Sequence, residues 1–286
     1  MTQSLVSRLM PFAIALRGSK PRYASAEKTR ARVAALRARP ASWSPPTSVE
    51  AIETTVNGWP VYTVGNPAAQ ARAVYLHGGA NIYEIDKRHW ALVAELAAAA
   101  SMRIDVPIYP LAPISTAGPI IEAVADLVTS IGATTVLGDS AGGGMSLATA
   151  MVLRDRGEPP VRVIMISPSL DLTFGDPKVA ELAKIDPWLD IPGAAAAAEL
   201  YRGGLPLTDP RVSSIFGSLD GLGELAIFVG TRDMLYADAL RLHSLAAAAG
   251  HPLEFHEVEG MIHVYPLLPI PEAKVARRRI AELLAL

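Results

Sequence analysis

Short apolar runs alternate with helix-length segments along most of this chain, and this alternation restricts the fold more than any other feature of the sequence. Branched and aromatic side chains make the runs typical of buried strands, at 73–76, 103–108, 134–137, 161–166, 225–229 and 253–258. Segments of helical composition separate or follow them, at 88–100, 119–131, 141–156, 236–249 and 271–286. Strands that are joined through helices pair in parallel, because each helix returns the chain to the starting edge. The sequence therefore predicts an α/β fold with a mostly parallel, twisted sheet and helices on both faces.

Two regions depart from this alternation. Asn57-Gly58 separates the runs 52–56 and 59–64, and this dipeptide favours a tight hairpin turn, which predicts an antiparallel edge of the sheet. The region 171–223 is rich in Ala and Pro and contains no clear strand, as expected for an insertion that lies over the sheet. A length of 286 residues suits one such fold, so we expect a single domain over 1–286.

The N-terminal region has its own character. Pro11 interrupts a short apolar stretch at 9–16, and no convincing small-residue cleavage site follows it. We expect an amphipathic helix within 1–17, with a degenerate export signal or contact with a membrane surface as the alternative. A basic, Ala-rich stretch at 25–39 predicts a further helix that stops at Pro40.

Composition argues against several classes of function. The formal net charge of −2 offers no electrostatic footprint for nucleic acid. Mean hydropathy is +0.27, yet no apolar run reaches the roughly 18 residues of a membrane span, so we expect a cytoplasmic protein without a transmembrane helix. The chain has no cysteine, which excludes a disulfide framework, a thiolate metal site and a cysteine nucleophile. Covalent chemistry would have to use oxygen or nitrogen.

A serine motif provides the first candidate for such chemistry. Gly138-Asp139-Ser140-Ala141-Gly142 directly follows the apolar run 134–137 and begins the helical segment 141–156, so Ser140 falls on a strand-to-helix turn. Glycines permit a tight backbone there, and the start of the helix directs N–H groups towards the serine. The pattern predicts Ser140 as a nucleophile; the alternative is that Ser140 only caps a helix.

A serine nucleophile needs a base and a carboxylate, which this type of fold supplies later in the chain in the order Asp or Glu, then His. Asp233 follows the run 225–229, and His263 follows the run 253–258, so each comes after the carboxyl end of a strand. We predict Asp233 and His263 as these partners. For Asp233 the alternative is a helix cap, with Asp238 as the nearest rival. The remaining histidines apart from His77 read as ordinary surface or core residues: His89, His243, His251 and His256.

The glycine pair Gly78-Gly79, shortly after the apolar run 73–76, predicts an oxyanion-binding site. Leu76-His77-Gly78-Gly79-Ala80 leaves backbone N–H groups available where an acyl-transfer enzyme must stabilise an oxyanion. We predict that the amides of Gly78, Gly79 and Ala141 converge on that oxygen, while His77 supports the loop. The alternative is a simple turn at the end of a strand.

These motifs together resemble the hormone-sensitive-lipase-like, or family IV, branch of bacterial esterases with an α/β-hydrolase fold, over nearly the whole chain. The similar segments are His77-Gly78-Gly79-Ala80, Tyr109-Pro110-Leu111-Ala112-Pro113, Gly138-Asp139-Ser140-Ala141-Gly142-Gly143 and Gly260-Met261-Ile262-His263-Val264-Tyr265. The resemblance implies a helical cap of about 1–45 and 175–205 on a core of 46–174 and 206–286. It further implies hydrolysis of short- to medium-chain acyl esters without cofactor or metal, by a monomer or a homodimer.

Three departures from the family pattern matter. Ala80 replaces the third glycine of the oxyanion loop, which restricts that loop and narrows the room for bulky alcohols. Pro110 replaces the usual arginine, and Ile114 replaces the usual acidic residue, which puts a supporting salt bridge of the family in doubt.

Apolar residues near the motifs and in the cap are candidates for the substrate pocket: Ile82, Tyr83, Trp188, Leu189, Leu200, Tyr201, Phe216, Val264 and Tyr265. Aromatic and aliphatic side chains at such positions are more often plain core. The function predicted is a serine carboxylesterase acting on a small acyl ester. Two alternatives stay open: the same three residues acting on an amide, an acetylated sugar or a carbamate, or a ligand-binding protein without catalysis.

Overall fold

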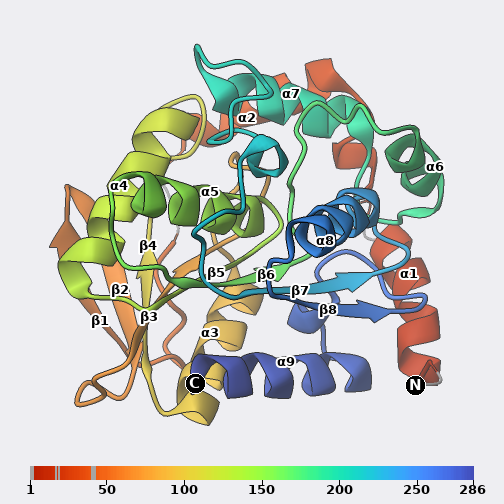
Figure 1. The fold of residues 1–286 in the computed structure, drawn as a ribbon. Coiled ribbons are helices and arrows are strands. Elements are labelled where there is room, and N and C mark those ends of the chain that lie inside the picture. Colours follow the sequence, from red (N-terminus) through yellow and green to blue (C-terminus); the bar gives the residue numbers. More distant parts are fainter. Residues whose placement is uncertain (1–2, 17, 19, 40–42) are drawn as a thin grey trace.

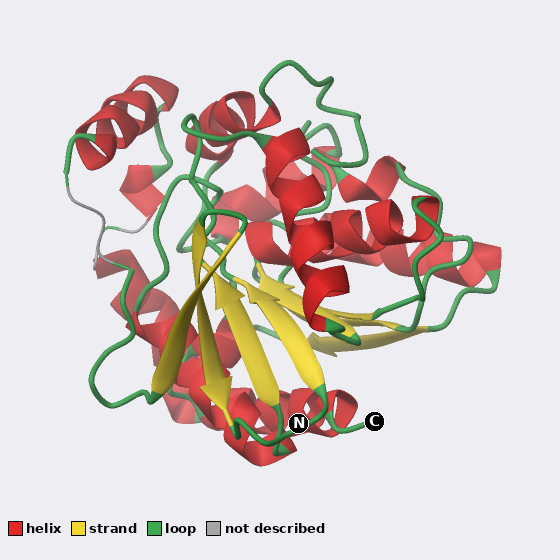
Figure 2. Ribbon diagram, turned by 90° about the vertical axis from the view of Figure 1, so that its left-hand side faces the viewer, coloured by secondary structure: helices red, strands yellow, loops and turns green. Residues whose placement is uncertain are grey.

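One twisted sheet of eight strands lies at the centre of residues 3–16, 18, 20–39 and 43–286, which the computed structural model describes (Figures 1 and 2). The strands are β1 Ala51–Val56, β2 Trp59–Gly65, β3 Arg72–Leu76, β4 Arg103–Pro107, β5 Thr135–Asp139, β6 Arg162–Ile166, β7 Leu225–Gly230 and β8 Leu253–Val258. Their order is β1-β2-β4-β3-β5-β6-β7-β8. β2 pairs with β1 and β4 in antiparallel fashion, and the pairs from β4 to β8 are parallel. The predicted fold class is confirmed, including its antiparallel edge.

Helices cover both faces of the sheet (Figure 1). One layer contains α4 Ala117–Ile131, α5 Ala141–Asp155 and α8 Tyr236–Ala249, and the other contains α3 Lys87–Ala100 and α9 Pro271–Leu284. Successive side chains of a strand point to opposite faces, and β3 shows the result. Val74 and Leu76 join one core cluster, whereas Ala73 and Tyr75 join the other. Strands that bury both faces are apolar throughout, which is why they appear as continuous apolar runs in the sequence.

Three helices lie over the edge where the parallel strands end, and we call them the cap: α2 Ala26–Arg37, α6 Pro177–Ile185 and α7 Ile191–Arg202 (Figure 1). α2 packs against α7. The Arg37 guanidinium donates to the carbonyl oxygens of Ile82 and Ala112 at 2.8 Å each, which ties α2 to loops of the core. The insertion predicted between 171 and 223 thus contributes α6 and α7, together with the short helix η2 Ser214–Phe216.

The first helix lies apart from the cap. α1 Leu5–Leu16 packs against α9, where Ser4 N donates to Glu272 Oε1 at 2.6 Å. A short helix, η1 Lys20–Arg22, leads from α1 towards α2. α2 ends at Arg37, and the predicted stop at Pro40 lies outside the described residues. In the described ranges, no helix combines the length and apolar character needed to cross a membrane.

Candidate active site

Ser140 forms the turn between β5 and α5. β5 extends to Asp139, two residues past the predicted strand, and α5 begins at Ala141. Ser140 has φ 52° and ψ −118°, a backbone conformation that costs roughly 1–3 kcal/mol outside glycine and persists only where the surroundings enforce it. The helix also approaches β3 closely: a Cβ on Gly142 would lie 1.9 Å from the carbonyl oxygen of Leu76. This tight turn presents the Ser140 side chain at the carboxyl edge of the sheet.

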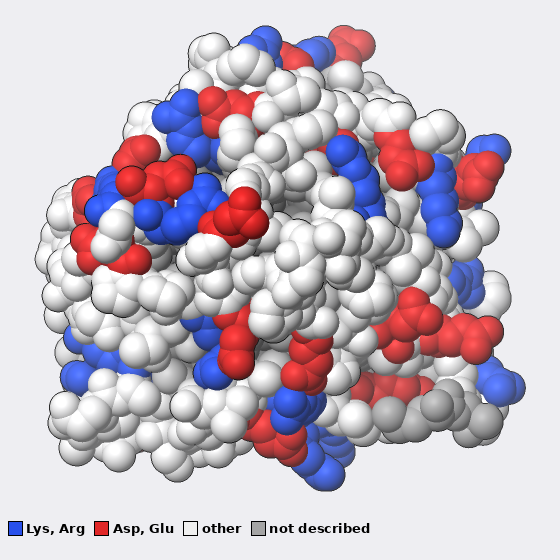
Figure 3. Space-filling view, viewed as in Figure 1, with Lys and Arg blue, Asp and Glu red and all other residues white. Residues whose placement is uncertain are grey.

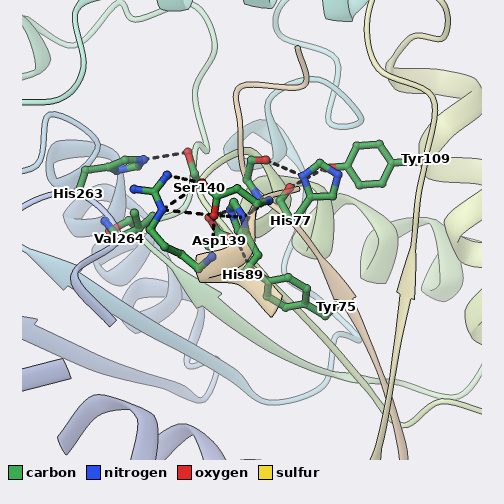
Figure 4. A network of polar contacts seen from close by, with 12 residues as sticks. Tyr75, His77, His89, Tyr109, Asp139, Ser140, His263 and Val264 are labelled. Carbon is green, nitrogen blue, oxygen red and sulfur yellow. Dashed lines mark hydrogen bonds and ion pairs between the residues drawn. The ribbon is translucent and has the colours of Figure 1, made fainter. Parts of the chain in front are cut away.

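Two loops bring a histidine and a carboxylate to that serine, and Figure 4 shows the histidine, His263, beside Ser140. His263 follows β8, and its Nε2 lies 3.0 Å from Ser140 Oγ. Asp233 follows β7, and its Oδ2 lies 2.9 Å from His263 Nδ1. All three side chains are buried or nearly so. The structure therefore brings Ser140, His263 and Asp233 together in one hydrogen-bonded row, as their spacing in the sequence predicts.

Burial and charge act in opposite directions on His263. Removal from water disfavours the imidazolium, but the Asp233 carboxylate and its hydrogen bond outweigh this, so the pKa of His263 is raised above its ordinary value. A second carboxylate, Asp186, adds to the same effect. The imidazole is therefore a stronger base than a free histidine.

Asp238, the rival of Asp233, lies elsewhere. It is on α8, fully buried, and neither of its carboxylate oxygens has a hydrogen-bond partner among the described residues. Burial raises the pKa of Asp238 to about 7, and the charge of Asp171 adds to this. Asp238 thus makes no contact with the histidine that Asp233 holds.

The oxyanion loop differs from the prediction in one residue. The Gly78 amide is not free, because it donates to Asp139 Oδ1 at 2.9 Å. Gly78 itself is needed there, since a Cβ would lie 2.2 Å from Asp139 Oδ2. The amides of Gly79, Ala80 and Ala141 have no acceptor among the described residues. The correction is therefore that Ala80 takes the place of Gly78 in the set of available donors, which a local pattern could not reveal.

Asp139, next to Ser140, is the centre of a buried polar network (Figure 4). Tyr75 donates its hydroxyl to Asp139 Oδ1 at 2.5 Å, and His89 Nε2 lies 3.5 Å from Asp139 Oδ2. Burial alone would raise the pKa of Asp139, but the charge of His89 lowers it below the usual range. Burial opposes the charged form of His89 too, yet Asp139 raises its pKa to about 9. The pair fixes the strand end from which Ser140 projects.

His77 supports the oxyanion loop as a neutral side chain. Its ring stacks on Tyr109 with centroids 4.5 Å apart, and its Nδ1 donates to the carbonyl oxygen of Gly78 at 2.7 Å. Burial lowers the pKa of His77 to about 4, and the neighbouring His89 contributes in the same direction. A neutral His77 can hold the loop without competing for the charge of Asp139.

Asp186, which the sequence does not single out, connects the cap to the loop after β7. Its Oδ1 accepts from the amides of Trp188 and Leu189 at 2.7 and 3.0 Å, and its Oδ2 accepts from Met234 N at 2.9 Å. Burial, and then the charge of Asp233, raises the pKa of Asp186 to about 6. Met234 directly follows Asp233, so the buried Asp186 carboxylate fixes the cap segment to the loop that carries Asp233.

A cavity of about 210 Å³ opens onto Ser140 and His263. Four of the predicted pocket residues line it: Tyr83, Trp188, Leu189 and Val264. The Trp188 and His263 rings meet edge to face with centroids 6.0 Å apart, and the guanidinium carbon of Arg88 lies 5.0 Å from the centroid of the Trp188 ring. A much smaller space of about 10 Å³ shares Asn81, Ala141, Ser169 and Leu172 with the cavity and extends it towards Tyr201.

The other predicted pocket residues lie outside the main cavity: Ile82, Leu200, Tyr201, Phe216 and Tyr265. Ile82 and Tyr265 are fully buried in opposite core clusters, and Leu200 packs against the core. Phe216 is 38% exposed and lies under the guanidinium of Arg241 at 5.3 Å. Tyr201 lines the small extension, whereas the expectations for Ile82, Leu200, Phe216 and Tyr265 were wrong, because position in the sequence does not determine which way a side chain points.

His89 has a closer connection to the site than the sequence predicts. Besides contacting Asp139, the charged His89 donates from Nδ1 to Asp86 Oδ1 at 3.1 Å, and Nδ1 also lies 2.9 Å from Asp86 N at the start of α3. The position of Asp86 three residues earlier was a usable signal for the start of that helix. No pattern in the sequence around His89 predicts its contact with Asp139. Within the described part of the chain, no three His, Asp or Glu side chains are grouped so that they could hold a metal ion.

Comparison with known proteins places this geometry in a family. A family model described as the alpha/beta hydrolase fold matches residues 73–267. An esterase of Acinetobacter venetianus is 33% identical over 229 residues, which cover 75% of this chain and 76% of that protein. A triacylglycerol lipase of Mycobacterium tuberculosis is 31% identical over 225 residues, or 75% of this chain, but the match spans only about half (47%) of that longer protein.

A solved structure agrees over the whole length. A crystal structure of an esterase from the bacterial hormone-sensitive lipase family superposes with a TM-score of 0.81 at 28% identity, covering 100% of this chain and 99% of that chain. The match includes the cap helices as well as the sheet. The chain belongs to the α/β-hydrolase family, in the hormone-sensitive-lipase-like branch of carboxylic ester hydrolases.

Proposed function

We propose that this chain hydrolyses short-chain acyl esters through Ser140, His263 and Asp233. The row Ser140 Oγ, His263 Nε2, His263 Nδ1 and Asp233 Oδ2, with gaps of 3.0 and 2.9 Å, is the observation that carries the proposal. His263 accepts the proton of Ser140 as Oγ attacks the ester carbonyl, and Asp233 holds the imidazole in the required orientation. His263 then gives this proton to the leaving alcohol. In the second half of the reaction His263 accepts a proton from a water molecule that attacks the acyl group, and it returns that proton to Ser140 Oγ as the acid is released.

The amides of Gly79, Ala80 and Ala141 stabilise the oxyanion of the tetrahedral intermediate in this proposal. Each well-placed donor in such a site contributes about 3 kcal/mol to the stability of the transition state. Ala80 has φ 52°, so its backbone already adopts the turn that a glycine would allow. The Asp139 carboxylate holds the loop from behind through Gly78. The alanine at this position therefore leaves the oxyanion site intact and adds one methyl group to its rim.

The limited volume of the cavity supports a preference for short acyl groups. Beyond Ser169 and Leu172 only the small extension of about 10 Å³ remains. Each buried CH₂ of the acyl chain gains about 0.8 kcal/mol, roughly fourfold in kcat/KM, until the chain meets the closed end. We expect kcat/KM for p-nitrophenyl esters to rise from acetate to butyrate and to fall steeply by decanoate.

Leu172→Ala tests this assignment of the acyl side. The substitution opens the extension, so the optimum should move to longer chains. Leu267→Ala, which changes another leucine of the cavity lining outside the extension, is the matched control and should leave the optimum in place. Equal turnover of acetate and decanoate esters by the wild-type protein would refute the proposed preference. Preferred turnover of matching anilides would instead favour an amide substrate.

A pH profile tests the role of His263. The pKa of His263 is raised above the ordinary value of about 6.5, so kcat/KM should decrease as the pH is lowered, and this decrease should start at a pH above 6.5. We call this part of the profile the acid limb. Asp186→Asn removes a nearby negative charge, so the limb should move to lower pH. Asp190→Asn, in the same cap segment, should leave it unchanged, since Asp190 caps α7 through Ile191 N. If the acid limb did not move in Asp186→Asn, the group that titrates in the profile would not be His263.

A further inference from the structure

The outward face of α1 is apolar. Leu5, Leu9, Phe12 and Leu16 are 76, 65, 68 and 90% exposed. Their spacing of four, three and four residues places them along one side of the helix. Surface helices normally turn their apolar stripe inward and their charges outward. The stripe on α1 is therefore unusual for a helix that only packs on its own core.

Contacts on the inner face fix this orientation. Ser7, Pro11 and Ile14 are the buried residues of α1. Ser7 donates its hydroxyl to Glu272 Oε1 at 2.9 Å, and the Ser4 hydroxyl donates to Glu272 Oε2 at 3.0 Å. Turning the stripe inward would break these bonds and turn both serines away from the Glu272 carboxylate. The polar side of α1 is thus the side that docks on α9.

Charge is distributed unevenly between the N-terminal segment and the rest of the chain. Residues 1–39 contain nine of the 26 basic residues and one of the 28 acidic residues, so their formal charge is +8 and that of 40–286 is −10. Arg8, Arg22, Lys28 and Arg30 are exposed, and none has an ion-pair partner among the described residues. By contrast, basic and acidic side chains are interspersed over the face shown in Figure 3. The segment that carries the apolar stripe also carries an unneutralised positive charge.

The size of the stripe decides between two kinds of partner. A helix of 12 residues is about 18 Å long, so a stripe about 10 Å wide covers roughly 200 Å². A stable protein interface needs about 800 Å² from each partner, which the stripe does not approach. A lipid surface requires no complementary shape and accepts apolar side chains to a depth of about 5–10 Å. Basic residues beside the stripe are attracted to anionic headgroups.

We propose that α1, with the basic segment that follows it, binds the surface of an anionic lipid layer. The four apolar side chains enter the layer, and Arg8 and the basic residues up to α2 lie at the level of the headgroups. α1 runs up one flank of the molecule towards the cap (Figure 1), and Arg22 and Tyr23, shortly after it, line the cavity above Ser140. Binding in this way holds the cavity entrance close to lipid-borne esters.

Flotation of the full chain with vesicles tests the proposal without any use of activity. We expect binding to phosphatidylcholine vesicles that contain about a third phosphatidylglycerol, weak binding to pure phosphatidylcholine, and loss of binding at 0.5 M salt, as for charge-dependent membrane association. Leu9→Ser with Phe12→Ser should weaken binding at least tenfold. Arg8→Gln with Lys28→Gln and Arg30→Gln should weaken it at least tenfold as well.

A matched control distinguishes this face from any exposed apolar residue. Ile52→Ser with Ile114→Ser removes two side chains that are 56 and 71% exposed, and Ile52 is on β1, at the opposite edge of the sheet from β8. This control should bind vesicles as the wild type does, and all variants should turn over a soluble short ester equally. The proposal is overturned by absence of binding to anionic vesicles, or by equal binding of the Leu9 and Phe12 double variant. It is also overturned if that variant only converts a dimer into a monomer.

Discussion

Ser140→Ala is expected to lower kcat on p-nitrophenyl butyrate by roughly 10⁵- to 10⁶-fold, the loss typical when a serine nucleophile is removed from such a site. Alanine leaves the backbone turn in place but removes Oγ, the only atom of residue 140 within reach of His263 Nε2. Residual hydrolysis would come from the oxyanion donors and substrate binding alone. Stopped assays with purified protein would measure the change, and circular dichroism would establish that the variant is folded.

Ser146→Ala is the matched control for this experiment. Ser146 is on the same helix α5, is fully buried, and donates its hydroxyl to the carbonyl oxygen of Gly142 at 2.7 Å. It does not line the cavity, so its turnover should match the wild type. A fluorophosphonate probe should label the wild type and Ser146→Ala but not Ser140→Ala. Substantial turnover by a folded Ser140→Ala protein would exclude Ser140 as the nucleophile, and failure to label the wild type would favour a binding protein without catalysis.

Asp233→Asn is expected to lower kcat by about 10⁴-fold, although the substitution changes almost no volume. The carboxylate accepts the Nδ1 proton of His263, which leaves Nε2 free to accept the proton of Ser140. An asparagine can place its NH₂ group towards Nδ1 instead. His263 would then carry its proton on Nε2, facing the serine, and could not act as the base. Kinetics on the alkaline plateau of the wild-type pH profile would measure the loss free of the acid limb.

Asp238→Asn provides the control that the sequence itself suggests. Asp238 comes five residues later, is equally buried, and has no hydrogen-bond partner for either carboxylate oxygen among the described residues. Its replacement should leave kcat unchanged, because it does not touch His263. If Asp238→Asn lost activity and Asp233→Asn kept it, the assignment of the triad acid would have to be reversed.

Local patterns were sufficient to predict the architecture. The parallel strands β3 to β7 bury both faces, so each appears as an apolar run in the sequence. The hairpin at Asn57-Gly58 and the turn at Ser140 depend on a few adjacent residues with particular backbone freedom. Because strands of one direction end at one edge of the sheet, the loops after β5, β7 and β8 had to meet there, and with them Ser140, Asp233 and His263.

Contacts between distant segments decided the remaining details of the site. Gly78 belongs to the glycine pair in the sequence, but Asp139, 61 residues later, occupies its amide and leaves Ala80 as a donor. Asp186 accepts a hydrogen bond from the amide of Met234, 48 residues later, and no pattern in the sequence around Asp186 predicts this contact. The sequence predicted an amphipathic helix within 1–17 but not which side of it packs on the protein, and the contacts of Ser4 and Ser7 with Glu272 show that the apolar stripe faces outward.

The sequence by itself determined the order of strands and helices, the edge of the sheet where the polar residues gather, and the three side chains that meet there. Only the tertiary structure decided which amides remain free, which buried carboxylates share the field around His263, and which face of α1 is left exposed. The physical reason is the range of the interactions. Backbone turns and periodic burial depend on adjacent residues, whereas the partner of a buried polar group is whatever the fold brings within about 3 Å of it.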